Sequence, residues 1–149
     1  MKRFYHFFVI VAVVILAANI NCYGQEVYGK LFKGSVANQK YGPVLDSVVM
    51  PLKNFQTLLN ETDKYIMFKI VNNSVIILNQ DRKVLYPENA TVKPEEVFSM
   101  YSKSVVEDLI SVGDADSVYF QQRKDVLSIT IGNITMEVAA FCPPLCPGP

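Results

Sequence analysis

The 149-residue sequence contains no tryptophan, a single histidine and three cysteines. The histidine, His6, stands within the first ten residues. No glycine-rich phosphate loop is present, and basic and acidic residues are equal in number. Beyond the N-terminal segment, these absences exclude Ser-His-Asp and Cys-His catalysis, histidine-containing zinc or iron sites, and phosphate-loop nucleotide binding. We therefore expect no catalytic residues, no cofactor and no metal site.

Two close carboxylate pairs remain, and neither predicts a site. Glu95 and Glu96 follow a proline at an expected helix start, where acidic residues suit the helix dipole. Asp114 and Asp116 follow a helix-ending glycine, where Asp commonly bonds the turn backbone. A calcium ion takes about six to eight oxygen ligands, so this second pair would need at least about four more.

The N-terminal 24 residues have the pattern of a cleavable secretory signal peptide. Two basic residues precede an almost wholly apolar run over residues 4–18, which asparagines then interrupt. An apolar core of about 12–15 residues is short for a membrane span, which needs about 20. Small residues before the cut favour cleavage between Gly24 and Gln25. We therefore expect a secreted or periplasmic protein.

A lipid anchor at Cys22 is the alternative to a free mature protein. The preceding residues 19–21 are unlike the apolar and small residues that lipoprotein sites prefer. Removing residues 1–24 takes away two basic residues and leaves 12 basic against 14 acidic, a net charge of −2. This composition argues against nucleic acid and anionic membranes as partners. No second apolar stretch of that length follows, so we expect no membrane span after signal removal.

The mature chain divides into three parts. Residues 25–50 are largely polar and dotted with glycine, and we interpret them as an N-terminal arm or edge strand. Residues 51–141 predict a single α+β domain, and a Cys/Pro-rich tail covers residues 142–149. A mature chain of about 125 residues suffices for one hydrophobic core. Cysteines at one end cannot hold that core together, so burial must stabilise it.

Hydrophobic spacing predicts two helices, each beginning at a proline. The first covers residues 51–60, and the second covers residues 94–112 with Gly113 as its end. The expected buried stripe of the second helix recurs every three or four residues and comprises Val97, Tyr101, Val105, Leu109 and Val112.

Three strands are expected after each helix. Apolar runs between turn signals place them at residues 65–71, 75–78, 83–86, 117–122, 126–131 and 134–141. The order of one helix and three strands thus occurs twice, and Ile66-Met67-Phe68 corresponds to Val118-Tyr119-Phe120. We predict an α+β fold with an antiparallel sheet, two helices on one of its faces, and a pseudo-duplicated αβββ-αβββ unit.

Four side chains alternate with core residues along the later strands and are candidates for an exposed sheet face that binds a partner: Tyr119, Gln121, Thr130 and Glu137. The alternative is that they form only the solvated side of the sheet. Together with the lack of catalytic equipment, they favour a non-catalytic binding module with an unidentified protein partner. An inhibitor of a secreted enzyme is a further alternative, by analogy with tandem αβββ inhibitors.

The tail carries Cys142 and Cys146, and an oxidising compartment favours a disulfide between them. Four polyproline steps would separate their Cα atoms by about 12 Å, whereas a bridge needs about 4.4–6.8 Å. Closure therefore requires a turn or a cis-proline within Pro143-Pro144. Free or intermolecular thiols, and a thiol redox or soft-metal role, are the alternatives.

The Cys-Pro-x-x-Cys-Pro pattern of this tail resembles the copper-handling motif of the SCO/SenC thioredoxin-like proteins. The resemblance covers six residues. In that family the motif stands early in the chain and a distant histidine completes the copper site, whereas no histidine follows it here. We therefore do not place the chain in that family.

Overall fold

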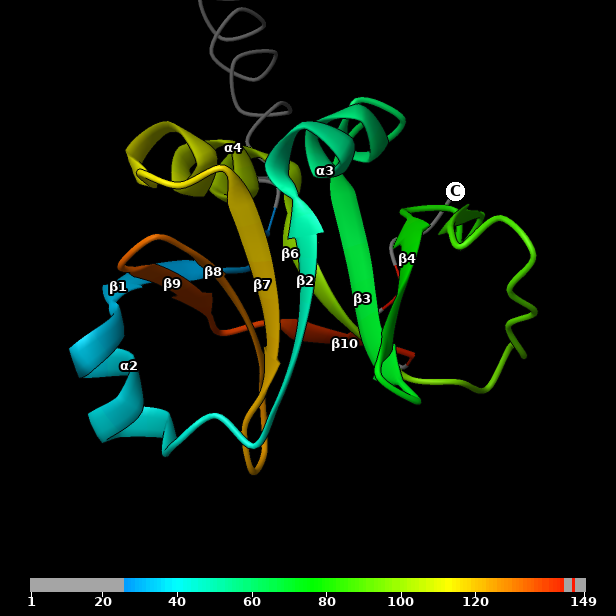
Figure 1. Cartoon of the computed structure of the whole chain (residues 1–149). Coiled ribbons are helices and arrows are strands. Elements are labelled where there is room, and N and C mark those ends of the chain that lie inside the picture. Colours follow the sequence, from blue (N-terminus) through cyan, green and yellow to red (C-terminus); the bar gives the residue numbers. More distant parts are fainter. Residues whose placement is uncertain (1–25, 144–145, 147–149) are drawn as a thin grey trace, which may run out of the picture.

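The computed structural model describes residues 26–143 and residue 146 (Figure 1). The elements, in chain order, are β1 (Lys30–Lys33), α2 (Gly34–Tyr41), β2 (Asp46–Pro51), α3 (Leu52–Leu59), β3 (Tyr65–Val71), β4 (Ser74–Asn79), β5 (Val84–Tyr86), β6 (Phe98–Ser102), α4 (Lys103–Val112), β7 (Ser117–Gln122), β8 (Leu127–Ile131), β9 (Ile134–Glu137) and β10 (Ala140–Cys142). The predicted signal peptide, its cleavage site at Gly24 and Gln25, and Cys22 lie outside the described residues.

The strands form two antiparallel five-stranded sheets. The first has the order β1-β9-β8-β7-β2 and the second the order β10-β6-β3-β4-β5. Helices α3 and α4 lie side by side over one side of the pair of sheets (Figure 1). The α+β class is thus confirmed, whereas the prediction of a single sheet is wrong. Each sheet turns an apolar face toward the other, and these two faces bury each other. The second sheet also buries apolar residues on its other face.

The predicted duplication is present, but each unit begins one strand earlier than expected. Each unit is a strand, a helix and a three-stranded meander: β2-α3-β3-β4-β5, then β6-α4-β7-β8-β9. Strand β2 pairs with β7 of the second meander, and β6 pairs with β3 of the first. The leading strand of each unit is therefore exchanged into the sheet of the other unit.

The first predicted helix is confirmed as α3, but the beginning of the second is wrong. Residues 98–102 form β6, and the helix begins only at Lys103. Strand β6 lies between β10 and β3 and carries apolar residues on both faces. In the sequence, its apolar residues therefore run without interruption into those of α4. Val97 precedes β6 and is 49% exposed, and Val112, the last residue of α4, is 54% exposed, so neither belongs to a buried stripe.

Most of the predicted strands are confirmed. Residues 65–71 and 117–122 are strands with the expected bounds, and Asn72-Asn73 forms the expected turn with φ values of 50° and 60°. The last predicted strand is not continuous. Val138 has a φ of 68°, so the chain leaves β9 there and crosses to the other sheet as β10.

The N-terminal part is more ordered than an arm. Strand β1 is an edge of the first sheet, as the sequence allowed, but α2 was not expected and β2 extends the sheet across the predicted domain boundary at residue 51. Within residues 26–143, no helix has the length and apolar character needed to cross a bilayer.

Two hydrophobic clusters stabilise the fold. The larger lies between the sheets and below α3 and α4, where the rings of Phe68 and Phe120, equivalent positions in the two units, lie 5.1 Å apart. Phe55 of α3 contacts both rings. The smaller cluster covers the other face of the second sheet and includes Met67, Phe98 and Cys142.

Candidate functional site

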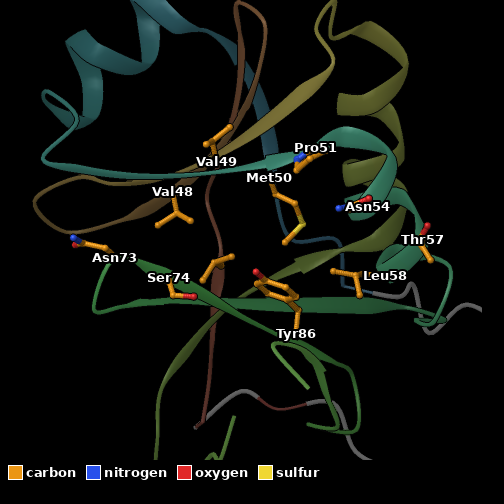
Figure 2. Close-up of a pocket in the computed structure, with 11 residues that line it drawn as sticks. Val48, Val49, Met50, Pro51, Asn54, Thr57, Leu58, Asn73, Ser74 and Tyr86 are labelled. Atoms are coloured by element: carbon orange, nitrogen blue, oxygen red, sulfur yellow. The ribbon is translucent and has the colours of Figure 1, made fainter. Parts of the chain in front are cut away.

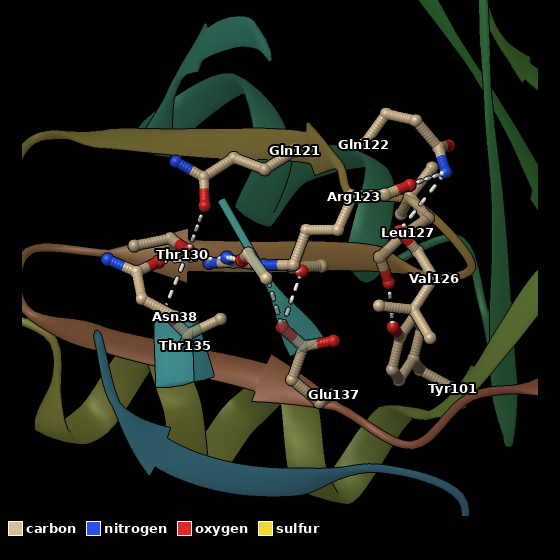
Figure 3. Close-up of polar contacts among 12 residues, drawn as sticks. Asn38, Tyr101, Gln121, Gln122, Arg123, Val126, Leu127, Thr130, Thr135 and Glu137 are labelled. Atoms are coloured by element: carbon tan, nitrogen blue, oxygen red, sulfur yellow. Dashed lines mark hydrogen bonds and ion pairs between the residues drawn. The ribbon is translucent and has the colours of Figure 1, made fainter. Parts of the chain in front are cut away.

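The four predicted face residues do lie on one side of the first sheet, opposite the larger core. Tyr119 and Thr130 are cross-strand neighbours, and Gln121 stands two residues along the same strand as Tyr119. The Thr130 hydroxyl bonds Gln121 Oε1 at 2.9 Å and the Thr135 hydroxyl at 3.0 Å (Figure 3). Of the four, only Tyr119, at 40% exposure, presents a large surface to solvent, since Gln121 is half-buried and Thr130 and Glu137 are buried.

Glu137 corrects the expectation of an exposed face, because its side chain is completely buried. Its carboxylate accepts a hydrogen bond from Ser128 at 2.5 Å and lies 3.2 Å from Arg123 Nε. Arg123 also donates to Asn38 Oδ1 of α2, at 2.8 Å, and to the Gly42 carbonyl (Figure 3). The unpredicted helix α2 therefore covers this end of the sheet and removes Glu137 from solvent.

One oxygen of the Glu137 carboxylate, Oε2, has no hydrogen-bond partner among the described residues. Burial raises the pKa of Glu137 above its ordinary value, although the hydrogen bond from Ser128 and the charge of Arg123 oppose that shift. Arg123 is itself only 2% exposed. Such an enclosed pair is a structural element beneath α2 rather than a surface for a partner.

The C-terminal cysteines form a disulfide. The Cα atoms of Cys142 and Cys146 lie 4.6 Å apart, and the Cys142–Pro143 peptide bond is cis, one of the two ways of closure that the sequence required. Cys142 ends β10 and is buried, while Arg82 donates to its carbonyl at 3.3 Å. The disulfide therefore lies at the end of β10, an edge strand of the second sheet.

The two close carboxylate pairs of the sequence do not form a site. Glu96 was predicted to stand at the start of a helix, but no helix begins there. It bonds Lys69 Nζ at 2.7 Å and the Lys93 N–H at 3.1 Å, and the bond from Lys69 lowers its pKa. Asp114 and Asp116 are exposed. Among the described residues, no three His, Cys, Asp or Glu side chains come together as a metal site would require.

A groove with a volume of about 480 Å³ lies beside β2. It lies between β2, α3, the β3–β4 turn and the end of β5. Val48 and Met50 point into it from β2, whereas Val49 points to the other side of the strand (Figure 2). Its lining carries no charged side chain and consists of Val48, Val49, Met50, Pro51, Asn54, Thr57, Leu58, Asn73, Ser74, Val75 and Tyr86.

Strand β2 is also an edge of the first sheet, with no neighbour on its groove side among the described strands. The Leu52 N–H donates to the Asp116 carbonyl at 2.8 Å, on the β7 side. Because ladder bonds alternate along an antiparallel strand, the N–H groups of Val49 and Ser47 point to the open side. The Ser47 N–H is bonded to the Asp46 carboxylate at 2.7 Å. Among the described residues, this leaves the Val49 N–H as the outward donor of the edge without a partner strand.

This groove was missed because its parts are distant in the sequence. The apolar run from Val44 to Met50 ending in Pro51 was the available signal, since a proline within a strand is characteristic of a sheet edge. The Arg123 pair was missed for a similar reason. Arg123 continues the period of two begun by Tyr119 and Gln121, but only the fold places α2 above it.

Comparison with protein families, curated proteins and solved structures found no match for this chain. The geometry of its own residues is therefore the basis for a function.

Proposed function

We propose that the protein is a non-catalytic binding module that acts in the periplasm or outside the cell and holds a partner protein in the groove beside β2. The observation that supports this proposal is the combination, at one place, of an uncharged groove and a strand edge that pairs with no other described strand. Grooves of this kind bind polypeptides, because apolar pockets and main-chain hydrogen bonds contribute together.

Exposed apolar residues around β2 favour the same site. Tyr86 lines the groove and is 40% exposed, while Leu45, in the loop before β2, is 66% exposed. Val49 is 58% exposed on the other side of β2. The outer face around Tyr119 is the weaker candidate, because its polar groups are largely bonded to one another.

Site-specific photo-crosslinking tests the proposal. A photoreactive residue is placed either at Thr57, on the exposed rim of the groove, or at Tyr119, on the outer face of the sheet. The purified protein is then irradiated in the envelope or culture fraction of the cells that produce it. We expect one defined protein adduct from Thr57 and none from Tyr119.

Two charge-matched variants complete the experiment. Ser74→Arg puts a bulky charge into the groove and is expected to abolish the Thr57 adduct. Ser111→Arg adds the same charge on an exposed position of α4 and is expected to leave it unchanged. An adduct from Tyr119 alone would assign binding to the outer face, and the absence of any adduct would contradict the proposal.

A further inference from the structure

Resting on this proposed function, we infer what occupies the groove: an extended, uncharged segment of a partner protein that pairs antiparallel with β2 and becomes a sixth strand of the first sheet. The basis is the internal duplication, because the equivalent strand of the second unit already carries such a neighbour.

Strands β2 and β6 are equivalent residue by residue. Pro51 pairs with Ser117 at the start of β7, and Ser102 pairs with Tyr65 at the start of β3. Immediately after each strand, the first helical N–H donates across to the other unit at 2.8 Å, from Leu52 to Asp116 and from Lys103 to Lys64. Val49 therefore corresponds to Met100, and Ser47 to Phe98.

The outer edge of β6 is covered by the chain itself. Strand β10 pairs antiparallel with it, with Ala140 opposite Met100 and Cys142 opposite Phe98. The Ser102 N–H donates to the Tyr28 carbonyl at 2.9 Å, and the Tyr28 N–H returns a bond to the Ser102 hydroxyl. The space left beside β6 is only about 230 Å³, and Phe141 of β10 helps to line it.

Within the described residues, the outer edge of β2 has none of these partners. Pro51 stands where Ser102 stands in the second unit, and a proline has no N–H for an arm such as Tyr28 to accept. The carboxylate of Asp46 bonds the N–H of Ser47. Pairing is thereby confined to the stretch around Val49, which is the same stretch that β10 covers on β6.

The same equivalence gives the direction and chemistry of the occupant. Since β10 runs antiparallel to β6, the occupant runs antiparallel to β2, with residues opposite Val49, Val48 and Ser47. Side chains that turn toward Val48 and Met50 meet an uncharged lining, so charged residues at those positions would lose hydration without a partner. Alternate apolar residues in an extended segment satisfy both requirements.

A displayed library of random seven-residue peptides provides the probe. The purified protein should select uncharged sequences with apolar residues at alternate positions. Titration of a synthetic peptide from this selection then gives its Kd for the wild type, for Val49→Pro and for Val49→Ala. The proline variant removes the outward N–H at an edge position, where proline is tolerated, and the alanine variant keeps it.

We expect Val49→Pro to weaken peptide binding about tenfold, the loss of roughly one main-chain hydrogen bond, and Val49→Ala to weaken it less than about twofold. Peptides N-methylated at successive positions test the pairing without changing the protein. Because strand pairing uses alternate amides, methylation should abolish binding at every second position only.

The outcomes separate this inference from the proposed function. If the Thr57 adduct forms but selected peptides show no alternation on N-methylation, the groove binds a partner in another way and the inference is overturned. If the protein instead dimerises through β2, with the dimer lost in Val49→Pro, the occupant is a second copy and the inference is again wrong. Selection of no groove-binding peptide also contradicts it.

Discussion

At the scale of single residues, the most consequential contact is the enclosed pair of Arg123 and Glu137. Both side chains are almost fully buried, and together with Ser128 and Asn38 they join the first sheet to α2. Removing two charges from water carries a large desolvation cost, which their attraction and hydrogen bonds offset only while both partners are present. The pair therefore contributes little net stability, but it favours the one packing of α2 in which both charges are paired.

Single and double substitutions of this pair are predicted to have strongly non-additive effects. Arg123→Met leaves Glu137 buried beside an apolar side chain and should lower the free energy of unfolding by about 3–5 kcal/mol. Arg123→Met combined with Glu137→Met removes both charges and should lie closer to the wild type than Arg123→Met alone. Urea unfolding of the single and double variants measures this. Additive losses would show that the two side chains act independently.

The pH dependence of stability follows from the raised pKa of Glu137. Between its ordinary and raised pKa values, the folded protein binds more protons than the unfolded chain does. Stability from this group therefore falls as the pH rises from the ordinary carboxyl pKa through the raised pKa of Glu137. The Glu137→Gln variant should lack this component. Its free energy of unfolding, subtracted from that of the wild type across pH 4–7, isolates the effect, and a difference that rises with pH would be the wrong sign.

At the scale of elements, β6 shows the limit of prediction from the local sequence pattern. Residues 94–112 have apolar spacing that suits a helix, yet the chain changes from β6 to α4 at Lys103. In β6, Phe98 and Met100 face the smaller cluster while Tyr101 faces the larger, an alternation with period two. A strand that is buried on both faces shows no alternation of apolar and polar residues. Its residues therefore also fit the apolar spacing predicted for the following helix.

The two edges of the first sheet are treated differently. Strand β1 runs directly into α2, which contacts both β1 and β9. Strand β2 instead carries Pro51 and the Asp46 carboxylate, two features that restrict pairing along an open edge. Such restriction protects against unselective pairing while leaving a short stretch around Val49 available. This combination fits a strand edge reserved for a short partner segment.

At the scale of the whole molecule, the exchange of leading strands makes the two units depend on each other. Strand β2 completes the sheet of β7, β8 and β9, and β6 completes the sheet of β3, β4 and β5. Phe68 and Phe120 meet between the units. Neither unit alone can bury its inner sheet face.

We therefore predict that a chain cut between β5 and β6 yields two fragments that are unfolded separately. Residues 26–94 and 95–149 each keep a leading strand without its partner sheet. When mixed, they should recover the circular dichroism and cooperative unfolding of the intact chain, because all contacts between the units are then restored. A fragment that folds alone with a cooperative transition would contradict this interdependence.

The sequence by itself determined the elements whose signals are local. Strands β3 and β7, the Asn72-Asn73 turn, α3, the end of α4, the repeated order of elements and the closable cysteine pair all follow from spacing within about a dozen residues. The expectation of an exported binding protein also comes from the sequence, and it stays a prediction.

Only the tertiary structure decided which strands share a sheet, and hence where the groove beside β2 lies. The burial of Glu137 under α2 and the open edge around Val49 depend on segments far apart in the chain. Local propensity depends on residues that are close in the sequence. The exchange of strands between the units depends instead on the free energy of burying both sheet faces at once. The four predicted face residues lie on one side of the first sheet, but Thr130 and Glu137 are buried there, and the groove beside β2 lies elsewhere.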